Sequence, residues 1–322
     1  MDAPQARRPR HRRGRRDSGR PPPRGRSRPV PCAKNPLPPC CRAFSRHAWK
    51  VLSFTSYRVE LTPTGTTLQG EDSGTGPPVV LLHGLTATRR YVLSGSRALE
   101  RSGHRVVAYD ARGHGESDAA ASYGYSEQTA DLGGLIAELG LERPVLVGQS
   151  MGAATALAFA LGAPEQVGAL VQITPAYAGE PQPDPRWERL ADGLERDGVD
   201  GFMDAYEPTT DPKYRDVVET FTRQRLGRHR HPDAVAQALR EVPRSAAFDG
   251  LERLAGLEVP TLIVATRDDA DPEHPLAVAE RYAELLPRAR LYVDPPGQSP
   301  LAWQGVRLSK AIASWLGEED GA

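Results

Sequence analysis

Short apolar runs alternate with longer amphipathic stretches over most of the chain. The runs are continuous, as expected of strands buried on both faces of a sheet. They cover residues 78–82, 105–109, 144–147, 169–173, 260–265 and 289–293. Helical periodicity lies at 89–102, 126–139, 150–161, 275–286 and 300–316, and a hairpin is predicted at 57–61 and 66–71. These repeated strand–helix–strand units predict an α/β fold, a mostly parallel sheet with helices on both faces.

The alternation is interrupted at residues 174–256. This stretch is charged, lacks a buried strand run and shows helical patterns at 187–196, 214–226 and 232–239. Because ligands bind at the carboxyl ends of strands in open α/β sheets, we expect the insertion to form a helical lid. The core is then predicted over 51–173 and 257–322. The aromatic residues of the lid predict an apolar pocket wall: Trp187, Phe202, Tyr206, Tyr214 and Phe221.

The first 50 residues differ in composition from the rest of the chain. They hold 15 Lys and Arg against two acids, whereas the whole chain is neutral. A segment rich in Arg, Pro and Gly buries too little apolar surface to offset its chain entropy, so we expect residues 1–50 to be disordered. Arg clusters also occur in nucleic-acid tethers and transit peptides. We interpret the tail instead as an extension that gives the folded domain no nucleic-acid partner.

The composition of the body excludes several classes of protein. Apolar residues make up 39% of the chain, but no apolar stretch approaches the roughly 20 residues that span a bilayer. The three cysteines, Cys32, Cys40 and Cys41, lie in or next to the tail and do not match a zinc-site spacing. The phosphate-binding pattern Gly-x-x-x-x-Gly-Lys is absent. We expect a cytoplasmic protein that acts on a small molecule without cofactor, metal or membrane; its oligomeric state stays open.

A serine stands at a strand-to-helix turn in the middle of the core. The predicted strand 144–147 runs into Gly148-Gln149-Ser150-Met151-Gly152, and an alanine-rich helix follows. A Gly-x-Ser-x-Gly elbow in this context forms a strained turn that lifts the hydroxyl above the sheet, at the positive end of the helix dipole. Ser150 is therefore the predicted nucleophile.

The loop after the strand 78–82 is predicted to support Ser150. It reads His83-Gly84-Leu85, and it can place the backbone N–H of Leu85 beside that of Met151. Two converging N–H donors stabilise a developing oxyanion, so we predict an oxyanion hole formed by Leu85 and Met151. We interpret His83 as a structural residue of this loop.

Three motifs together identify a family. They are HGL at 83–85, DARGHGESD at 110–118 and GQSMG at 148–152. The chain resembles the α/β-hydrolase fold superfamily, in its lid-bearing esterase, haloperoxidase and epoxide-hydrolase-like branch, over about residues 57–318. Within the second motif, we interpret Asp110 and His114 as internal hydrogen-bond partners that fix a tight turn. In this family the catalytic residues follow the order nucleophile, acid, histidine.

The resemblance implies an acid in the loop after the strand 260–265. That loop supplies Asp268, Asp269 and Asp271. The spacing from the strand favours Asp268 or Asp269. The spacing to the next helix, and the family's recurrent Asp-Pro-x-x-Pro, favour Asp271. We predict Asp271 as the acid and keep Asp268 as the second candidate.

The resemblance also implies a histidine just after the last predicted strand, 289–293. Gln298 stands at that position, and no histidine follows His274. An amide does not titrate near neutral pH, so Gln298 cannot take a proton from Ser150. Loss of the triad histidine costs on the order of 10⁶ in turnover in well-studied serine hydrolases. A conventional mechanism therefore requires another base.

Three histidines are candidates for that base. His274 lies in the acid loop, three residues beyond Asp271, whereas His229 and His231 lie in the predicted lid, among arginines that disfavour the protonated form. Two hypotheses follow. The first is a serine hydrolase of a small ester, lactone or amide with an atypical triad. The second, favoured by Gln298, is a pseudoenzyme or small-ligand-binding protein on the same fold.

Overall fold

The computed structural model describes residues 54–61, 64–207, 211–319 and 321. The predicted disordered tail and its three cysteines lie outside these residues. Within the described part, no helix is both long enough and apolar enough to cross a membrane.

An eight-stranded sheet forms the centre of the fold, in the order β1-β2-β4-β3-β5-β6-β7-β8. The predicted hairpin is present: β1 pairs antiparallel with β2, and β2 pairs antiparallel with β4. All later neighbours are parallel, which confirms the predicted α/β class. The strands are β1 Phe54–Glu60, β2 Thr67–Gly74, β3 Pro78–Leu82, β4 Arg105–Tyr109, β5 Val145–Gln149, β6 Ala169–Ile173, β7 Thr261–Ala265 and β8 Ala289–Val293.

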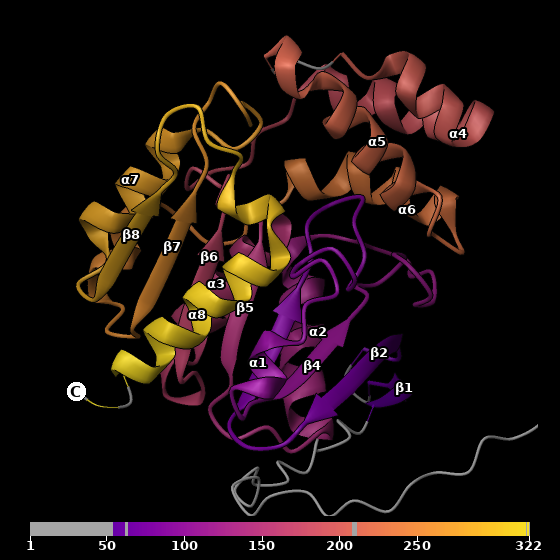
Figure 1. The fold of residues 1–322 in the computed structure, drawn as a ribbon. Coiled ribbons are helices and arrows are strands. Elements are labelled where there is room, and N and C mark those ends of the chain that lie inside the picture. The colour runs from indigo at the N-terminus through magenta and orange to yellow at the C-terminus, as the bar shows by residue number, and fades with distance from the viewer. Residues whose placement is uncertain (1–53, 62–63, 208–210, 320, 322) are drawn as a thin grey trace, which may run out of the picture. The chain divides into compact units, whose positions relative to one another are not determined.

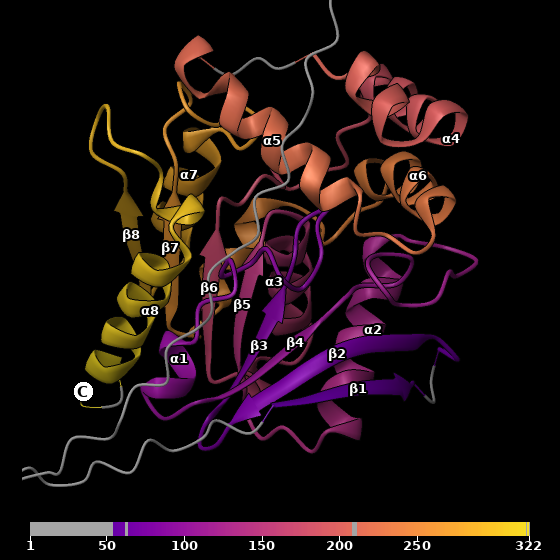
Figure 2. The same ribbon diagram turned by 45° about the vertical axis from the view of Figure 1, so that its right-hand side comes forward.

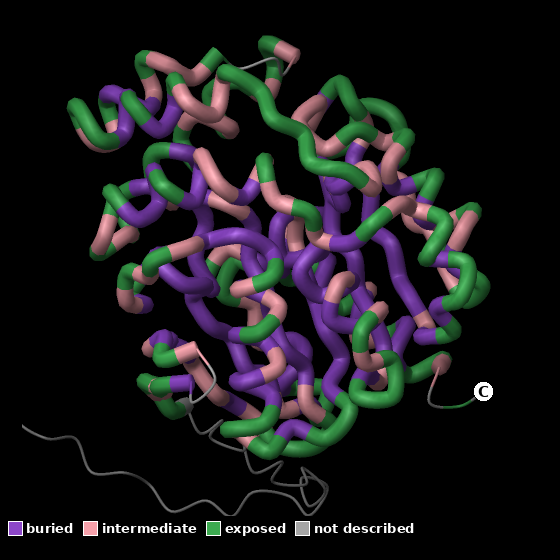
Figure 3. Tube along the Cα trace, turned by 180° about the vertical axis from the view of Figure 1, so that it is seen from behind, coloured by how far each residue is buried: buried purple, intermediate pink, exposed green. Residues whose placement is uncertain are grey.

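Helices cover both faces of the sheet, because successive side chains of each strand point to opposite sides. Val80 and Leu82 of β3 pack with α2, α3 and α7, whereas Val79 and Leu81 pack with α1 and α8. Figure 1 shows α1 and α8 in front of the strands, and Figure 3 shows the buried central strands within more exposed helices. The bounds are α1 Ala98–Arg101, α2 Tyr125–Glu138, α3 Met151–Gly162, α7 Leu276–Leu285 and α8 Gly305–Glu319. Among the residues that the structure describes, five short 3₁₀ turns connect elements: η1 Pro164–Gln166, η2 Pro212–Tyr214, η3 Val242–Arg244, η4 Leu251–Gly256 and η5 Leu301–Trp303.

The first predicted helix, at 89–102, is much shorter than its sequence pattern indicates. Only Ala98–Arg101 is helical, and the preceding residues form turns. Arg89 is buried and forms an ion pair with the fully buried Asp110, which draws this segment onto the sheet edge. Gly95 has a positive φ of 73° that interrupts a helix. Tertiary charge pairing and a turn therefore override the local periodicity.

Three helices lie over the carboxyl ends of the parallel strands, as Figure 2 shows. They are α4 Pro185–Ala205, α5 Arg215–Leu226 and α6 Pro232–Glu241, and we call them the α4–α6 layer. A kink at Asp197 and Gly198 divides α4. The layer has an apolar cluster of its own, built from Leu190, Ala191, Leu194, Phe202, Leu226, Val235, Ala236 and Leu239. It therefore packs as a unit above the sheet edge where ligands bind in this fold class.

The buried ion pair between Arg112 and Asp131 generates a stability prediction. Two hydrogen bonds of 2.7 Å join the guanidinium to the carboxylate, and both residues are almost fully buried. Arg112→Met leaves a buried carboxylate without its counterion, so we expect the free energy of unfolding to fall by about 3–5 kcal/mol. Urea denaturation measures this. The control is Arg105→Met, which breaks a more exposed pair with Asp72 and should cost about 1 kcal/mol or less. Equal losses in the two variants would contradict the prediction.

Candidate active site

Ser150 stands on a strained turn between β5 and α3. Its φ of 52° and ψ of −112° are rare for a residue with a side chain and lift that side chain out of the strand. The turn requires glycine on both sides. A side-chain carbon added at Gly148 would lie 2.3 Å from the Gly152 carbonyl oxygen, and one added at Gly152 would lie 2.3 Å from the Leu82 carbonyl oxygen. Met151 begins α3, so its N–H belongs to the first turn of the helix.

The loop after β3 forms a tight turn against Ser150. We call residues 84–87 the 84–87 turn; a 3.0 Å hydrogen bond from the Ala87 N–H to the Gly84 carbonyl closes it. A side-chain carbon added at Gly84 would lie 3.3 Å from the Cβ of Ser150, so only glycine allows this approach comfortably. Leu85 follows directly and faces the same pocket as Ser150.

His83 fixes this turn from within the protein. Its Nδ1–H donates to the Gly84 carbonyl at 2.8 Å, and its Nε2 accepts the Ala111 N–H at 2.9 Å. Burial lowers the pKa of His83 to about 4, so the ring is neutral at neutral pH. His83 is therefore a structural residue that hydrogen-bonds within this loop, as predicted. The Gly84 carbonyl and the Leu85 N–H belong to one peptide group, which means that His83 orients that N–H.

The loop 110–118 is held together as predicted, although Asp110 and His114 do not bond to each other. Asp110 accepts N–H groups from Arg89 at 2.7 Å and from Glu116 at 2.9 Å. The Nδ1 of His114 bonds to the Arg112 carbonyl at 2.9 Å. Both side chains form hydrogen bonds with backbone groups of this polar turn.

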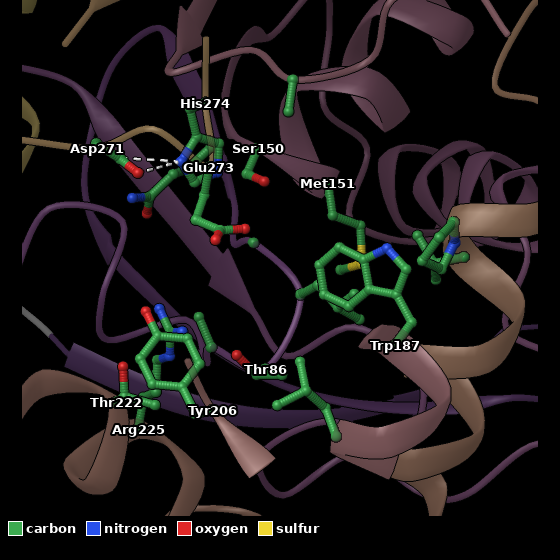
Figure 4. Close-up of a pocket in the computed structure, with 18 of the residues that line it drawn as sticks. Thr86, Ser150, Met151, Trp187, Tyr206, Thr222, Arg225, Asp271, Glu273 and His274 are labelled. Carbon is green, nitrogen blue, oxygen red and sulfur yellow. Dashed lines mark hydrogen bonds and ion pairs between the residues drawn. The ribbon is translucent and has the colours of Figure 1, made fainter. Parts of the chain in front are cut away.

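A pocket of about 560 Å³ opens above the elbow, between the sheet edge and the α4–α6 layer. Figure 4 shows part of its lining. Four of the five predicted aromatic residues line it, Trp187, Phe202, Tyr206 and Phe221; the fifth, Tyr214, makes an edge-to-face contact with Trp303 instead. In the described part of the chain, no group of three or more His, Cys, Asp and Glu side chains is arranged to hold a metal ion.

Asp271 and His274 form a hydrogen-bonded pair in this pocket. The Nδ1 of His274 lies 2.9 Å from each carboxylate oxygen of Asp271, as the dashed lines of Figure 4 show. A backbone hydrogen bond from His274 to Asp271 closes the same four-residue turn. Burial acts to lower the pKa of His274, but the Asp271 charge and hydrogen bond, with Glu273, outweigh it and raise that pKa. Bonding through Nδ1–H leaves Nε2 as the proton acceptor of the neutral ring.

The other two aspartates of the loop have different contacts. The carboxylate of Asp268 accepts the Leu276 N–H at 2.8 Å, at the start of α7. Asp269 forms a 3.0 Å ion pair with Lys213 on the surface. Neither residue lines the pocket, whereas Asp271 does.

Gln298 lies on an exposed turn after β8 and does not line the pocket. Its N–H donates to the Pro295 carbonyl at 3.3 Å, and its own carbonyl accepts the Tyr214 hydroxyl at 3.4 Å. Asp294 anchors this loop, because its carboxylate accepts the Leu301 N–H at 2.9 Å. Trp303, at the end of the 3₁₀ turn η5 that follows this loop, lines the pocket, whereas Gln298 does not.

The two candidate histidines in the connection between α5 and α6 do not line the pocket either. His229 uses both ring nitrogens in bonds to the core, with Thr86 and Gly115. The carbonyl of His231 accepts the Ala234 N–H at 3.1 Å, at the start of α6. Of the three predicted candidates for the base, the structure brings only His274 into the pocket of Ser150.

Arg225 is a pocket residue that sequence reasoning missed. It lies on the face of α5 that also carries Val218 and Thr222, at helical spacings of four and three residues. Its Nε is buried without a hydrogen-bond partner, and among the described residues the side chain makes no ion pair within 4 Å. Burial lowers the pKa of Arg225, although Tyr206 and Asp271 act in the opposite direction. An arginine that continues a pocket-facing helical stripe was the available signal in the sequence.

The parallel sheet, the strained serine elbow and the pocket at the carboxyl ends of the strands define a class of protein, the α/β hydrolases. The chain belongs to the α/β-hydrolase fold family, whose model matches residues 77–305.

Relatives and solved structures agree with this assignment. The chain is 34% identical over 241 residues to 2-hydroxy-6-oxononadienedioate/2-hydroxy-6-oxononatrienedioate hydrolase 2 of Pseudomonas putida, covering 70% of this chain and 82% of that protein. A hydrolase of the same description from Burkholderia vietnamiensis is 32% identical over 256 residues, covering 75% and 88%. A thermophilic esterase from Thermogutta terrifontis, solved with malate bound, superposes with a TM-score of 0.66 at 27% identity, covering 82% of this chain and 98% of that chain. The enol-lactonase from Burkholderia xenovorans LB400 shares the fold, with a TM-score of 0.66 at 21% identity, covering 81% and 98%.

Pairing with Asp271 leads us to expect that the pKa of the His274 ring lies above its ordinary value. We expect the His274 ring to titrate above pH 6.5, and Asp271→Asn to lower this pKa because burial then acts without the carboxylate charge. NMR titration of the ring Cε1–H measures the pKa, and His274→Gln assigns the resonance. By linkage, the pair stabilises the fold fully below pH 6.5, and this contribution is lost as pH rises through the raised pKa.

The control for this titration is Asp268→Asn, which changes a carboxylate of the same loop that does not contact His274. It should leave the His274 pKa in place. A wild-type pKa below 6.5, or an unchanged pKa in Asp271→Asn, would contradict the assigned pairing.

Proposed function

We propose that this protein is a serine hydrolase that cleaves a small carbonyl compound carrying a carboxylate group. Ser150 attacks the carbonyl carbon, His274 takes the serine proton and returns it to the leaving group, and Asp271 orients the imidazole. Water then releases the acyl group from Ser150, with His274 as the base again. This is an ester-, lactone- or amide-type hydrolysis without a cofactor.

The observation that carries the proposal is the Nδ1 bond of His274 to Asp271 in the pocket of Ser150. This bond fixes the tautomer of His274 in which Nε2 is free to act as a base. Orienting the histidine in this way is the role of the acid in a catalytic triad. The chain order nucleophile, acid, histidine is retained, although only two residues separate the last two. Only the neutral form of His274 can act as a base, and its pKa is raised above the ordinary value of 6.5. Activity should therefore increase as the pH rises through the pKa of His274.

The 84–87 turn supports the electrostatic part of the mechanism. The peptide group between Gly84 and Leu85 is held at its carbonyl by His83, and the first N–H of α3 belongs to Met151. The C=O and N–H of a trans peptide point in opposite directions, so anchoring the carbonyl directs the N–H of Leu85 to the other side. N–H donors that are held in place before the reaction stabilise the negative charge that develops on the carbonyl oxygen in the transition state.

Arg225 supports a substrate with a negative charge. The Arg225 side chain is half-buried, and its Nε is buried without a hydrogen-bond partner. A bound carboxylate would satisfy the guanidinium through two parallel hydrogen bonds. Figure 4 shows Arg225 grouped with Tyr206 and Thr222 along the pocket, and both of these side chains carry hydroxyl groups. The two hydrolase relatives are named for dioates, which are dicarboxylates, and the esterase structure has malate bound. All three names refer to a molecule that carries carboxylate groups.

The competing hypothesis, a ligand-binding pseudoenzyme, is favoured by Gln298 alone. An exposed residue that does not line the pocket does not remove a base from it. The pocket instead contains a histidine, His274, that is bound to a carboxylate. We therefore place the hydrolase first and leave the pseudoenzyme as an outcome of the following experiment.

Activity of matched variants tests the proposal. Wild-type protein should label with a fluorophosphonate probe and hydrolyse p-nitrophenyl esters, and Ser150→Ala should do neither. His274→Gln should lower kcat by about 10⁴- to 10⁶-fold, and Asp271→Asn by about 10⁴-fold, because the base or its orientation is lost. Gln298→Ala should keep kcat within about two-fold, because that side chain is outside the pocket.

His231→Gln is the matched control, since it removes a histidine that does not line the pocket. Wild-type protein that neither labels nor turns over ester, combined with a gain of activity in Gln298→His, would establish the pseudoenzyme hypothesis instead. Activity retained in His274→Gln would exclude His274 as the base.

A pair of substrates tests the carboxylate site. Mono-p-nitrophenyl succinate carries a carboxylate that p-nitrophenyl butyrate lacks. Arg225→Met should raise KM for the succinate ester by about 10- to 100-fold, the loss expected from a charge-assisted hydrogen bond of about 1.5–3 kcal/mol. KM for the butyrate should change little. Arg223→Met is the control from the same helix, because Arg223 pairs with Asp200 on the surface. An equal change for both esters would contradict the proposed role.

A further inference from the structure

A row of three histidines connects the α4–α6 layer to the loop beside Ser150. The ring centroids of His83 and His114 are 5.2 Å apart, and those of His114 and His229 are 5.6 Å apart. His83 and His114 are buried in the core, whereas His229 comes from the short connection between α5 and α6. The proposed mechanism uses none of these rings as an acid or a base.

His229 makes its two ring hydrogen bonds to two different core loops. Its Nε2–H donates to the Thr86 carbonyl at 2.9 Å, and its Nδ1 accepts the Gly115 N–H at 2.8 Å. The next residue adds a third bond, from the Arg230 N–H to the Gly115 carbonyl at 2.7 Å. Both ring nitrogens of His229 are therefore engaged, and the residue acts as a tie between the α4–α6 layer and the core.

Thr86 has a backbone conformation that needs external support. Its φ is 64°, in the left-handed region, where a β-branched residue is strained. Such a conformation persists only where the surroundings determine it more strongly than the residue's own preference. Thr86 is the third residue of the 84–87 turn, which also contains Leu85. The His229 hydrogen bond therefore holds the turn at its strained position.

We propose that His229 is a positioning residue that couples the α4–α6 layer to the oxyanion hole through the carbonyl of Thr86. His83 holds the 84–87 turn from the core at Gly84, and His229 holds it from the α4–α6 layer at Thr86. With the carbonyls on both sides of Leu85, those of Gly84 and Thr86, held in place, the N–H of Leu85 keeps a constant direction. The role of Leu85 in this coupling rests on the proposed hydrolase function, whereas the tie itself rests on the hydrogen bonds.

Three substitutions separate the two bonds of His229. His229→Gln keeps an N–H donor at about the reach of Nε2, and His229→Asn keeps an acceptor at about the reach of Nδ1. His229→Phe keeps the ring and loses both bonds. We expect Phe and Asn to lower kcat for a p-nitrophenyl ester by about 10- to 100-fold, with KM within about three-fold, since displaced oxyanion donors affect the transition state. Gln should keep kcat within about three-fold.

Amide hydrogen exchange provides a measurement that does not need turnover. The Ala87 N–H closes the 84–87 turn, so its exchange reports how firmly the turn is held. Exchange at Ala87 should become faster in the Phe and Asn variants and stay at the wild-type rate in Gln. Circular dichroism shows that each variant is folded, and His231→Phe is the control from the same connection.

The outcomes distinguish this inference from the proposed function. Wild-type kcat and wild-type exchange in the Phe and Asn variants would overturn the coupling. A Gln variant as impaired as Phe would overturn the assignment to the Thr86 bond. Wild-type protein without any esterase activity would refute the proposed function, and the exchange rates at Ala87 would then decide whether the tie exists.

Discussion

The close packing of two backbone segments at the end of β5 is the constraint on which the rest of the site depends. Glycines at 148 and 152 let the elbow carbonyls and the end of β3 approach to distances that no side chain would allow. This approach imposes a positive φ on Ser150 and places it beside the 84–87 turn. The helix α3, the turn after β3 and the pocket above them are all positioned by that contact. The serine conformation is costly by itself, so the surrounding sheet has to stabilise it.

Features that depend on local sequence were predicted well. The buried strands, the hairpin, the order of secondary structure and the family follow from apolar periodicity and three motifs, because each residue there acts on its immediate neighbours. The predicted helix at 89–102 was wrong over most of its length. Its periodicity is real, but a buried arginine, Arg89, pairs with Asp110 from a distant loop, and no local pattern reports such a contact.

The candidate site was predicted unevenly for the same reason. Ser150 and the glycines around it are recognisable from spacing alone. Asp271 and His274 were both named, but their hydrogen bond depends on how one loop folds back on itself, which sequence spacing does not determine. The contacts of Arg225 and His229 depend on how α5 and the connection after it lie on the core. Gln298 drew attention because it breaks a family pattern, and its exposed position is a property of the loop after β8.

The four-residue turn that contains Asp271 and His274 has a consequence for how this fold can change. In the usual arrangement, two loops from two strands must keep a fixed distance for an acid to reach its histidine. In the proposed mechanism both groups lie on one short segment after β7, which is held by backbone hydrogen bonds from the Asp271 N–H to the Arg267 carbonyl and from the His274 N–H to the Asp271 carbonyl. The loop after β8 is thereby freed from catalytic geometry and can accept insertions, deletions or new contacts. The pair itself becomes a compact module that could be transferred to another α/β-hydrolase scaffold as one stretch of sequence.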